Sequence, residues 1–417
     1  MADLHSADWL VPVVGDPIPN GALLEADGVI TAVGRRADLR KLDHDHEQHW
    51  DGVIIPGLVN AHTHLQYSHM AAVGSRRYAD FPEWVTHFQA AFAEPGHDWY
   101  AAALEGARQA IATGTTAIAD VVTNPEALPV LRNIGVKGIA YWEFLSWANA
   151  RSPESARTHA EKMIKEHQDL PIGLSPHAPH TLDEDVLVEL TDIGHEFGLR
   201  RHVHVAESLS EVEFIGSGSG PHDQALRQWG IDDFALQRRQ GSGLRPVDYL
   251  DRLVRLGPDC HIAHGIYTDA DDRAVLRRRR TVVALCPRSN ATISLDEAPV
   301  ADYLREGNLV AVGTDSLAST PSLDLLADLA ELAAIAARQG YRESDLDNRL
   351  LEAATLGGSK AMGLDQTANP VGALASGWSA DFAVVAVNEP RQVVYEGAGQ
   401  VTATVIDGSV RHRATSR

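Results

Sequence analysis

The chain has 417 residues, of which 44% are hydrophobic and 22% are charged, as in ordinary globular enzymes. Its formal net charge of -21 disfavours nucleic acid or an anionic membrane as a partner. The first dozen residues lack the basic and apolar stretches of a signal peptide, and no apolar run is long enough to span a membrane. Because the two cysteines, Cys260 and Cys286, both lie in apolar runs, we expect buried thiols and a cytoplasmic protein.

The two ends of the chain read as short strands broken by turns, without a strong helix. The pairs Asp27–Gly28, within residues 1–52, and Asp407–Gly408, within 368–417, are typical of two-residue β-hairpin turns. Half of a sandwich cannot bury its own apolar face. We therefore expect both ends to combine into one composite β-sandwich.

The middle of the chain alternates between β-rich segments and segments with helical spacing. The expected strands are 53–61, 115–122, 136–144, 171–175, 201–206, 259–263, 281–286 and 308–313. Helices are expected between them at Trp99–Thr113, Pro153–His167, Asp183–Phe197, Pro246–Leu256, Asp269–Arg280 and Leu323–Arg338. Eight strands separated by helices predict an α/β fold, a (β/α)₈ TIM barrel over residues 53–367. The segment 214–245, rich in Gly and Ser at two points, reads as a mobile loop near the barrel mouth, and its role as a lid is left open.

Ligand-type side chains follow four of the expected strands. His62 and His64 end the first strand, and alternate residues of an extended backbone point to the same side, so that both imidazoles can bind one ion. His204 and Glu207 end the fifth strand, in H-V-H-V-A-E. His264 follows the sixth strand and Asp315 the eighth. Because the carboxyl ends of barrel strands meet at one face, these groups predict a single metal site.

The motifs together resemble the amidohydrolase superfamily, in its branch of cytosine deaminases, chlorohydrolases and adenosine-type deaminases. The matching pieces are H-T-H, H-V-A-E, A-H-G and G-T-D after the first, fifth, sixth and eighth strands, with A-A-T-L-G-G-S-K-A-M-G-L and G-W-S-A-D-F-A-V-V near the end. The resemblance covers essentially the whole chain. It implies a metal-dependent hydrolase of C–N bonds that deaminates an N-heterocycle, through attack of a metal-bound hydroxide and release of ammonia.

The resemblance also implies a role for each site residue. The metal ligands would be His62, His64, His204 and Asp315, and the catalytic groups Glu207, His264 and Asp315. Three imidazoles and one carboxylate leave an open position for water, and zinc is favoured, although iron and manganese accept similar ligands. We interpret His202, two residues before His204, as a packing residue or one behind the ligands.

The number of ions can be judged from the lysines. Two-metal amidohydrolases for cyclic amides bridge their ions with a carboxylated lysine. Lys137 lies in the expected third strand, and no lysine falls in the fourth. The spacing of His204 and Glu207 is the one-metal deaminase pattern, so we expect one divalent ion. The other zinc deaminase class, with P-C-x-x-C, is excluded by the cysteine count.

Candidate substrate-binding residues are Gln66, Trp84, His177 and Glu143. Gln66 lies two residues after His64 and is expected to look into the mouth. The run H-T-H-L-Q-Y-S followed by D-F-P-E-W is most similar to 6-aminodeoxyfutalosine deaminases of menaquinone biosynthesis, although those often have Glu at the position of Gln66. The resemblance thus implies an aminated purine nucleoside, such as 6-aminodeoxyfutalosine, as the substrate.

Two alternatives are kept beside the deaminase hypothesis. One is hydrolysis of a chlorinated triazine or a cyclic amide on the same scaffold, which would release chloride or open a ring without ammonia. The other is a non-catalytic assembly protein, which such a complete set of ligand positions disfavours. A small-molecule substrate is expected in either enzymatic case, and whether the chain forms a homo-oligomer is left open.

Overall fold

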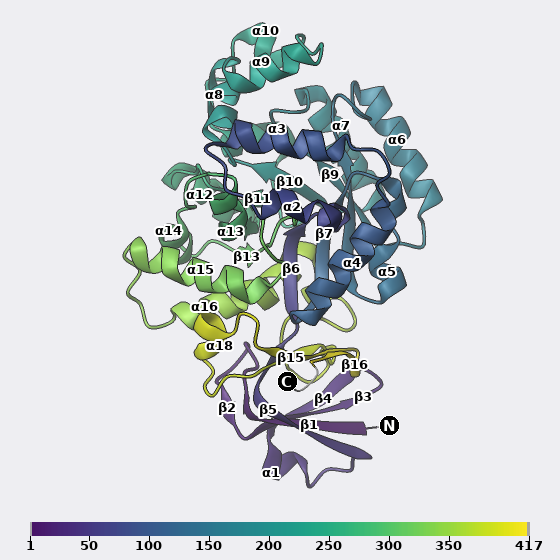
Figure 1. Cartoon of the computed structure of the whole chain (residues 1–417), viewed down its shortest axis with the longest axis vertical. Helices are drawn as coiled ribbons and strands as arrows, with labels where there is room; N and C mark the ends of the chain where they lie inside the picture. The colour runs from purple at the N-terminus through teal and green to yellow at the C-terminus, as the bar shows by residue number, and fades with distance from the viewer. Residues whose placement is uncertain (1, 415–417) are drawn as a thin grey trace.

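The computed structural model describes residues 2–414, so residue 1 and residues 415–417, at the outer ends of the two terminal segments, lie outside the described part. Two sheets organise the chain. One is a ring of parallel strands surrounded by helices, and the other combines strands from both termini at one end of that ring (Figure 1).

Eight parallel strands follow one another round a nearly closed barrel in chain order, which confirms the predicted fold class. They are β6 (Leu58–Thr63), β7 (Thr115–Val122), β8 (Lys137–Phe144), β9 (Ile172–Pro176), β10 (Arg201–Val205), β11 (Cys260–His264), β12 (Val283–Leu285) and β13 (Val310–Val312). The ends of the ring are joined by side chains and loops. The Asn60 amide donates to Thr314 Oγ1 at 2.8 Å, and the Asp315 N–H donates to the His62 carbonyl at 3.0 Å.

The predicted strand 53–61 is wrong as a single element. The chain forms β5 (His46–Pro56), which belongs to the terminal sheet, and then β6, which opens the barrel. Gly57 separates them, and it packs so closely on Thr116 that a Cβ there would lie 2.1 Å from Thr116 Oγ1. A continuous apolar run concealed this junction, since both strands are buried.

The expected helices are confirmed to within two residues at each end. Five of the six begin after a residue whose side chain caps the helix, and the one that starts at Pro246 has no such cap. The Asp98 carboxylate, for example, accepts from the Ala101 N–H at 2.8 Å. The helices around the barrel are α4 (Trp99–Ala112), α5 (Val130–Ile134), α6 (Pro153–Glu166), α7 (Glu184–Phe197), α11 (Pro246–Val254), α12 (Ala270–Arg279), α13 (Pro287–Thr292), α14 (Val300–Arg305), α15 (Leu325–Arg338), α16 (Leu346–Glu352) and α17 (Gly358–Met362). Two helices follow β6, namely α2 (Ala71–Gly74) and α3 (Phe81–Phe92).

Both termini build the second sheet. Its order is β16-β15-β14-β5-β1-β3-β4, with β2 beside β1, so that β14 from the tail pairs with β5 from the head. Its elements are β1 (Ala2–Leu10), β2 (Ile18–Pro19), β3 (Gly21–Ala26), β4 (Val29–Arg35), β14 (Phe382–Val385), β15 (Val401–Ile406) and β16 (Ser409–Arg413), with the short helices α1 (Arg36–Leu39) and α18 (Gln392–Glu396). Both Asp-Gly pairs join adjacent strands with positive φ at each residue, as a type I′ turn requires.

The segment 214–245 is not the loop that its composition predicts. It carries α8 (Leu209–Ser217), α9 (Pro221–Gln228) and α10 (Ala235–Arg239), and apolar side chains such as Phe214 and Phe234 form a small core of their own. It is anchored on the loop after β9, where the His222 ring stacks on His180 with centroids 4.0 Å apart. Short helices were missed because no single one shows a long apolar period.

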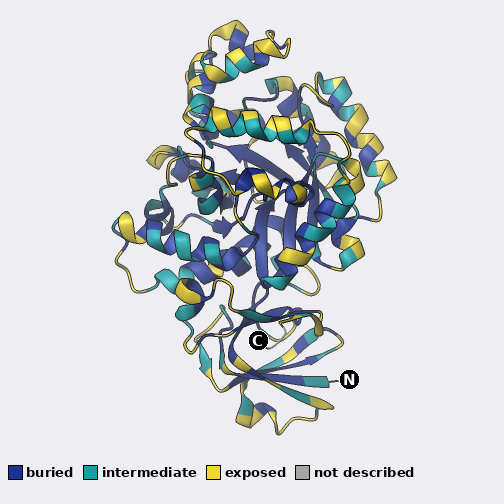
Figure 2. Ribbon diagram, viewed as in Figure 1, coloured by how far each residue is buried: buried dark blue, intermediate teal, exposed yellow. Residues whose placement is uncertain are grey.

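The barrel interior is the main buried part of the molecule. In Figure 2 the barrel strands are uniformly dark blue, while the outer faces of the surrounding helices are teal and yellow. No helix within residues 2–414 is both long and apolar enough to cross a membrane.

Candidate metal and catalytic site

Four predicted ligands converge at the carboxyl end of the barrel. His62 comes from β6 and His64 directly follows that strand, while His204 comes from β10 and Asp315 from the loop after β13. Asp315 Oδ1 lies 3.6 Å from His62 Nε2 and 3.8 Å from His64 Nε2. His64 Nε2 is also 3.4 Å from His204 Nε2. Groups separated by more than a hundred residues thus present their nitrogen and oxygen atoms to one point.

The donor set fits a tetrahedral divalent ion. Ligands at 2.0–2.1 Å from a tetrahedral centre are roughly 3.3 Å from one another, close to the separations between these atoms. His62 Nε2 is fully buried, and no hydrogen-bond partner for it lies among the described residues. An unpartnered buried nitrogen is costly unless something else takes its lone pair, which a metal ion does.

The imidazoles are in the form that binds metal. Burial lowers the pKa of His62, His64 and His204 below the usual value, so that each ring is neutral. His204 Nδ1 lies 2.9 Å from the main-chain oxygen of His177, which can only accept, so Nδ1 carries the proton and Nε2 keeps its lone pair.

The backbone is left-handed just after or at the carboxyl ends of three barrel strands that carry site residues. Ala206, His264 and Asp315 have φ of 55°, 72° and 60°, although none is glycine. Such conformations cost on the order of 1 kcal/mol each and persist where the surrounding structure enforces them. They turn the chain sharply at the ends of β10, β11 and β13, which brings Glu207, His264 and Asp315 over the barrel mouth.

A glycine provides the close approach that His62 needs. A Cβ on Gly313 would lie 2.7 Å from His62 Cβ and 2.9 Å from Cys286 Sγ. Separations under 3 Å between such atoms require a neighbour to shift. The absence of a side chain at Gly313 therefore lets β13 and β6 come close enough for Asp315 Oδ1 to lie 3.6 Å from His62 Nε2.

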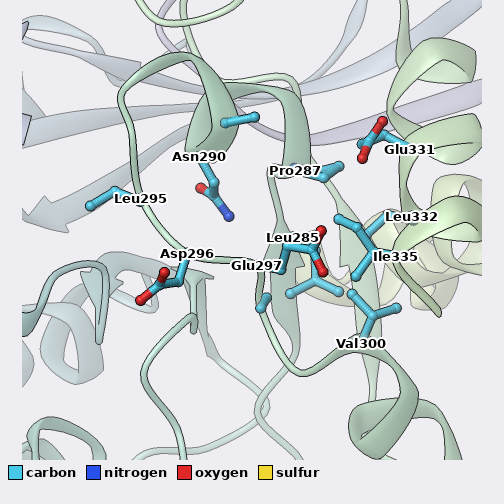
Figure 3. Close-up of a pocket in the computed structure, with 12 residues that line it drawn as sticks. Leu285, Pro287, Asn290, Leu295, Asp296, Glu297, Val300, Glu331, Leu332 and Ile335 are labelled. Atoms are coloured by element: carbon cyan, nitrogen blue, oxygen red, sulfur yellow. The ribbon is translucent and has the colours of Figure 1, made fainter. Parts of the chain in front are cut away.

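Residues of α13, which sequence reasoning missed, hold two of the reacting groups. Ser289 Oγ donates to Asp315 Oδ2 at 2.7 Å, and His264 Nδ1 is 3.3 Å from Asn290 Oδ1. Figure 3 shows Asn290 on the wall of a small cavity of about 50 Å³, together with Leu285 and Pro287. Ser289 and Asn290 both follow β12, the seventh barrel strand. Their position just beyond a strand end is the sequence signal that could have identified them.

Glu207 lies opposite His264, with Oε1 3.5 Å from Nε2. Burial raises the pKa of Glu207 to about 7, so that it holds a proton through much of the neutral range. Its main chain is fixed by Glu211, which accepts from the N–H groups of Ala206 and Glu207 at 2.9 and 2.8 Å. Glu211 was not predicted, although the capping pattern Ser208-x-x-Glu211 is visible in the sequence.

The sequence of residues 53–411 matches the amidohydrolase family. This match covers most of the chain and includes every residue of the site described above. The chain belongs to the amidohydrolase family.

Relatives of this amidohydrolase act as deaminases. Aminodeoxyfutalosine deaminase from Deinococcus radiodurans is 31% identical over 374 residues, 86% of this chain and 85% of the relative. A 5'-deoxyadenosine deaminase from Methanosarcina acetivorans is 28% identical over 96% of this chain and 89% of its own. The crystal structure of a zinc-bound adenosine deaminase from Xanthomonas campestris has the same fold, with a TM-score of 0.83, 22% identity and coverage of 100% and 94%. The amidohydrolase is thus a hydrolase that cleaves C–N bonds.

Gln66 is fully buried beside the metal pair, but its carbonyl end is turned to the loop after β7. Its Oε1 accepts from the N–H groups of Asn124 and Thr123 at 3.0 and 3.3 Å. The amide Nε2 has no hydrogen-bond partner within residues 2–414. Gln66 therefore offers one unused donor on this side of the site.

Glu143 ends β8 and neighbours the same loop. Its Oε2 accepts from Thr123 Oγ1 at 2.7 Å, and its Oε1 is buried without a partner in the described part of the chain. Burial raises the pKa of Glu143 to about 7. Gln66 and Glu143 thus approach Thr123 from two sides, one with a free donor and the other with a free acceptor.

His177 lies between Glu143 and the metal ligands. Its Nδ1 is 3.0 Å from Thr181 Oγ1, and its ring packs on His204 with centroids 4.8 Å apart. One atom from each of Glu143, His177 and His204 lies within 4.8 Å of the others. Because His204 already belongs to the first set of ligands, we treat this trio as the wall of one site.

Trp84 on α3 packs against the loop that follows Asp315. Its indole Nε1 donates to the Ala318 carbonyl at 2.9 Å. The centroid of its ring lies 5.5 Å from that of Phe81 and 5.3 Å from that of Phe88. Trp84 is therefore part of an aromatic cluster at the mouth. Sequence reasoning missed how this cluster ties α3 to the barrel.

Lys137 does not belong to the cluster of predicted metal ligands. It opens β8 at the amino end of the barrel, where Nζ is 2.7 Å from Asp381 and 2.6 Å from Asp407, both in the terminal sheet. The lysine thus joins the barrel to the second sheet, which agrees with its exclusion as a bridging ligand.

Proposed function

We propose that this amidohydrolase removes the exocyclic amino group of an adenosine-type nucleoside as ammonia, with 6-aminodeoxyfutalosine as the first substrate to test. The observation that carries the proposal is a buried set of three neutral imidazoles and one carboxylate beside Glu207, whose pKa burial raises to about 7. The relatives supply the substrate class, because those compared above are deaminases of adenosine-type compounds.

The proposed ligands are His62, His64, His204 and Asp315. A divalent ion, with zinc favoured, supplies Lewis acidity when bound and lowers the pKa of a coordinated water to about 7. Asp315 Oδ1 faces the two imidazoles at the end of β6, while Oδ2 is kept in place by Ser289. Asp315 is therefore placed to take a proton from the attacking water.

The remaining proton steps fall to Glu207 and His264. Protonated Glu207 gives its proton to the ring nitrogen beside the carbon under attack, which makes that carbon more electrophilic. His264, oriented by Asn290, accepts a hydrogen bond through Nε2 and turns the water toward the ring. One water adds to the carbon, the C–N bond to the amino group breaks, and the proton held by Asp315 leaves with ammonia. The proton of the added hydroxyl returns to Glu207 as the new C=O bond forms, which restores the acid for the next turnover.

We propose that Gln66, Glu143, His177 and Trp84 hold the substrate. Glu143 Oε1 and Gln66 Nε2 are a free acceptor and a free donor on either side of Thr123. A sugar hydroxyl can donate to the first, and a second hydroxyl can accept from the second, which suits a vicinal diol. His177 lies nearer the metal ligands and would contact the base, and Trp84 would close the mouth above it.

A substrate panel tests the reaction. The zinc-loaded protein is incubated with 6-aminodeoxyfutalosine, 5'-deoxyadenosine, adenosine, cytosine, a chlorotriazine and a dihydropyrimidine, with ammonia and chloride assayed separately. Ammonia from a purine nucleoside supports the proposal. Chloride release, or ring opening without ammonia, would replace it with one of the alternative hydrolases, and no turnover of any compound would contradict it.

A second experiment tests the sugar contact. Loss of a hydrogen bond to a charged group should raise KM by about 10- to 100-fold. Wild-type protein should therefore prefer adenosine over 2',3'-dideoxyadenosine by such a factor, and Glu143→Leu should lose this preference while retaining kcat with the dideoxy compound. Ser146→Ala, a change of a buried hydroxyl three residues on, is the matched control. An unchanged preference in Glu143→Leu would remove Glu143 from the sugar site.

A further inference from the structure

His202 lies behind one of the proposed metal ligands. It is fully buried in β10, two residues before His204, and its side chain faces the barrel interior. His202 Nε2 is 2.7 Å from His62 Nδ1. On the other side of the ring, His202 Nδ1 is 3.2 Å from the main-chain oxygen of His261. A continuous path of hydrogen bonds thus runs from a peptide carbonyl through His202 to His62.

The direction of every hydrogen bond in this path follows from the His261 main-chain oxygen at its end. A peptide oxygen can only accept, so His202 Nδ1 must carry a proton to bond with it. Both rings are fully buried, where the charged form of an imidazole is disfavoured, so each ring carries one proton. His202 Nε2 is then a bare acceptor, and the proton between the two rings belongs to His62 Nδ1.

The consequence appears on the far side of His62. With its proton on Nδ1, the ring has its lone pair on Nε2, the buried atom that lacks a partner in the described chain and lies 3.6 Å from Asp315 Oδ1. This tautomer is the one that a metal ion bound at Nε2 requires, and the hydrogen bonds of the protein set it. His204 is set in the same way by the His177 carbonyl.

We propose that His202 is a positioning residue that holds the His62 ring in its Nδ1–H tautomer and aims its Nε2 lone pair at the metal. The inference rests on the metal site of the proposed function. Groups behind metal-ligating histidines typically affect metal affinity by about 10- to 100-fold. His202 therefore contributes to metal affinity without touching the ion.

Packing offers a competing explanation for His202. Its ring stacks on His261, with centroids 3.9 Å apart and planes at 13°, and meets Tyr141 edge-on at 5.4 Å. If packing were its whole role, phenylalanine would replace it well, because phenylalanine keeps the stack and is apolar. If the hydrogen bond matters, glutamine should do better, because its amide can accept from His62 and donate to the His261 carbonyl.

The test compares His202→Phe with His202→Gln, and His261→Phe is the matched control. The control changes the neighbouring buried ring but keeps the main-chain oxygen that orients His202. Zinc affinity is measured by competition with a chromophoric chelator, the ligand geometry by the visible bands of the cobalt-substituted protein, and folding by thermal unfolding of the metal-free protein. These readouts do not depend on turnover.

We expect zinc affinity to fall by about 10- to 100-fold in His202→Phe, and to stay within about threefold of wild type in His202→Gln and in His261→Phe. Wild-type affinity and unchanged cobalt bands in His202→Phe would overturn the inference, as would an equal loss in both His202 variants. If wild-type protein itself bound no metal, the proposed function would fail instead.

If His202→Phe does not fold, a measurement on wild-type protein tests the same point. Nitrogen NMR of metal-free protein labelled at histidine distinguishes the two neutral tautomers, and His202→Gln assigns the signals. The inference requires Nδ1–H at both His62 and His202. An Nε2–H tautomer at His62 would contradict it.

Discussion

Replacement of Glu207 by glutamine tests the centre of the proposed mechanism. Glutamine keeps the size of the side chain and leaves the main-chain N–H free to donate to Glu211, as in the wild type at 2.8 Å. It cannot transfer a proton. The change should therefore leave the fold and the metal content intact and remove general acid catalysis.

The size of the effect follows from the proton that Glu207 holds. General acid catalysis contributes about 10²- to 10⁴-fold, which corresponds to about 2.7 to 5.4 kcal/mol of transition-state stabilisation. With its pKa raised to about 7 by burial, Glu207 is about 90% protonated at pH 6 and about 10% at pH 8. Because the protonated form is active, wild-type kcat/KM should fall about tenfold between these pH values.

The assay is ammonia release across pH 6 to 8, with zinc content measured on the same samples. Glu207→Gln should show about 10²- to 10⁴-fold lower kcat/KM at pH 6, full zinc content and no decline on the alkaline side. Activity within threefold of wild type would refute the acid role. A decline at the same pH in the variant would show that another group titrates there.

Three further changes probe other parts of the structure. Gly313→Ala forces a Cβ to within 2.7 Å of His62 Cβ, so zinc affinity measured by chelator competition should fall, and the free energy of unfolding should decrease by about 1 to 3 kcal/mol. Unchanged zinc affinity would show that β6 and β13 can move apart without disturbing the site. Lys137→Met leaves the buried Asp381 carboxylate without its cation, so urea unfolding should show a free energy of unfolding lower by about 3 kcal/mol, with kcat/KM unchanged. Loss of zinc in this variant would contradict the placement of Lys137 between the two sheets. Removal of the metal with a chelator should abolish ammonia release, and zinc should restore it; turnover by verified metal-free protein would contradict the proposed chemistry.

The barrel could be predicted because its signals are local. Buried parallel strands are short apolar runs, and the helices between them carry their own caps, as Asp98 does for α4. Where two signals merged, the prediction was wrong. The run 53–61 crosses from one sheet to another at Gly57, and only the pairing of β5 with β14 and of β6 with β7 shows that the strand divides there.

The candidate ligands could be named in advance because the carboxyl ends of barrel strands meet at one face, wherever the strands lie in the chain. The sequence by itself therefore determined which side chains gather at the mouth. The tertiary structure decided how they are held: Ser289 against Asp315, Asn290 against His264, and His202 behind His62. These contacts join different strands and loops, and their geometry depends on the close approach of β13 to β6 and on left-handed backbone at strand ends, neither of which has a local sequence signal.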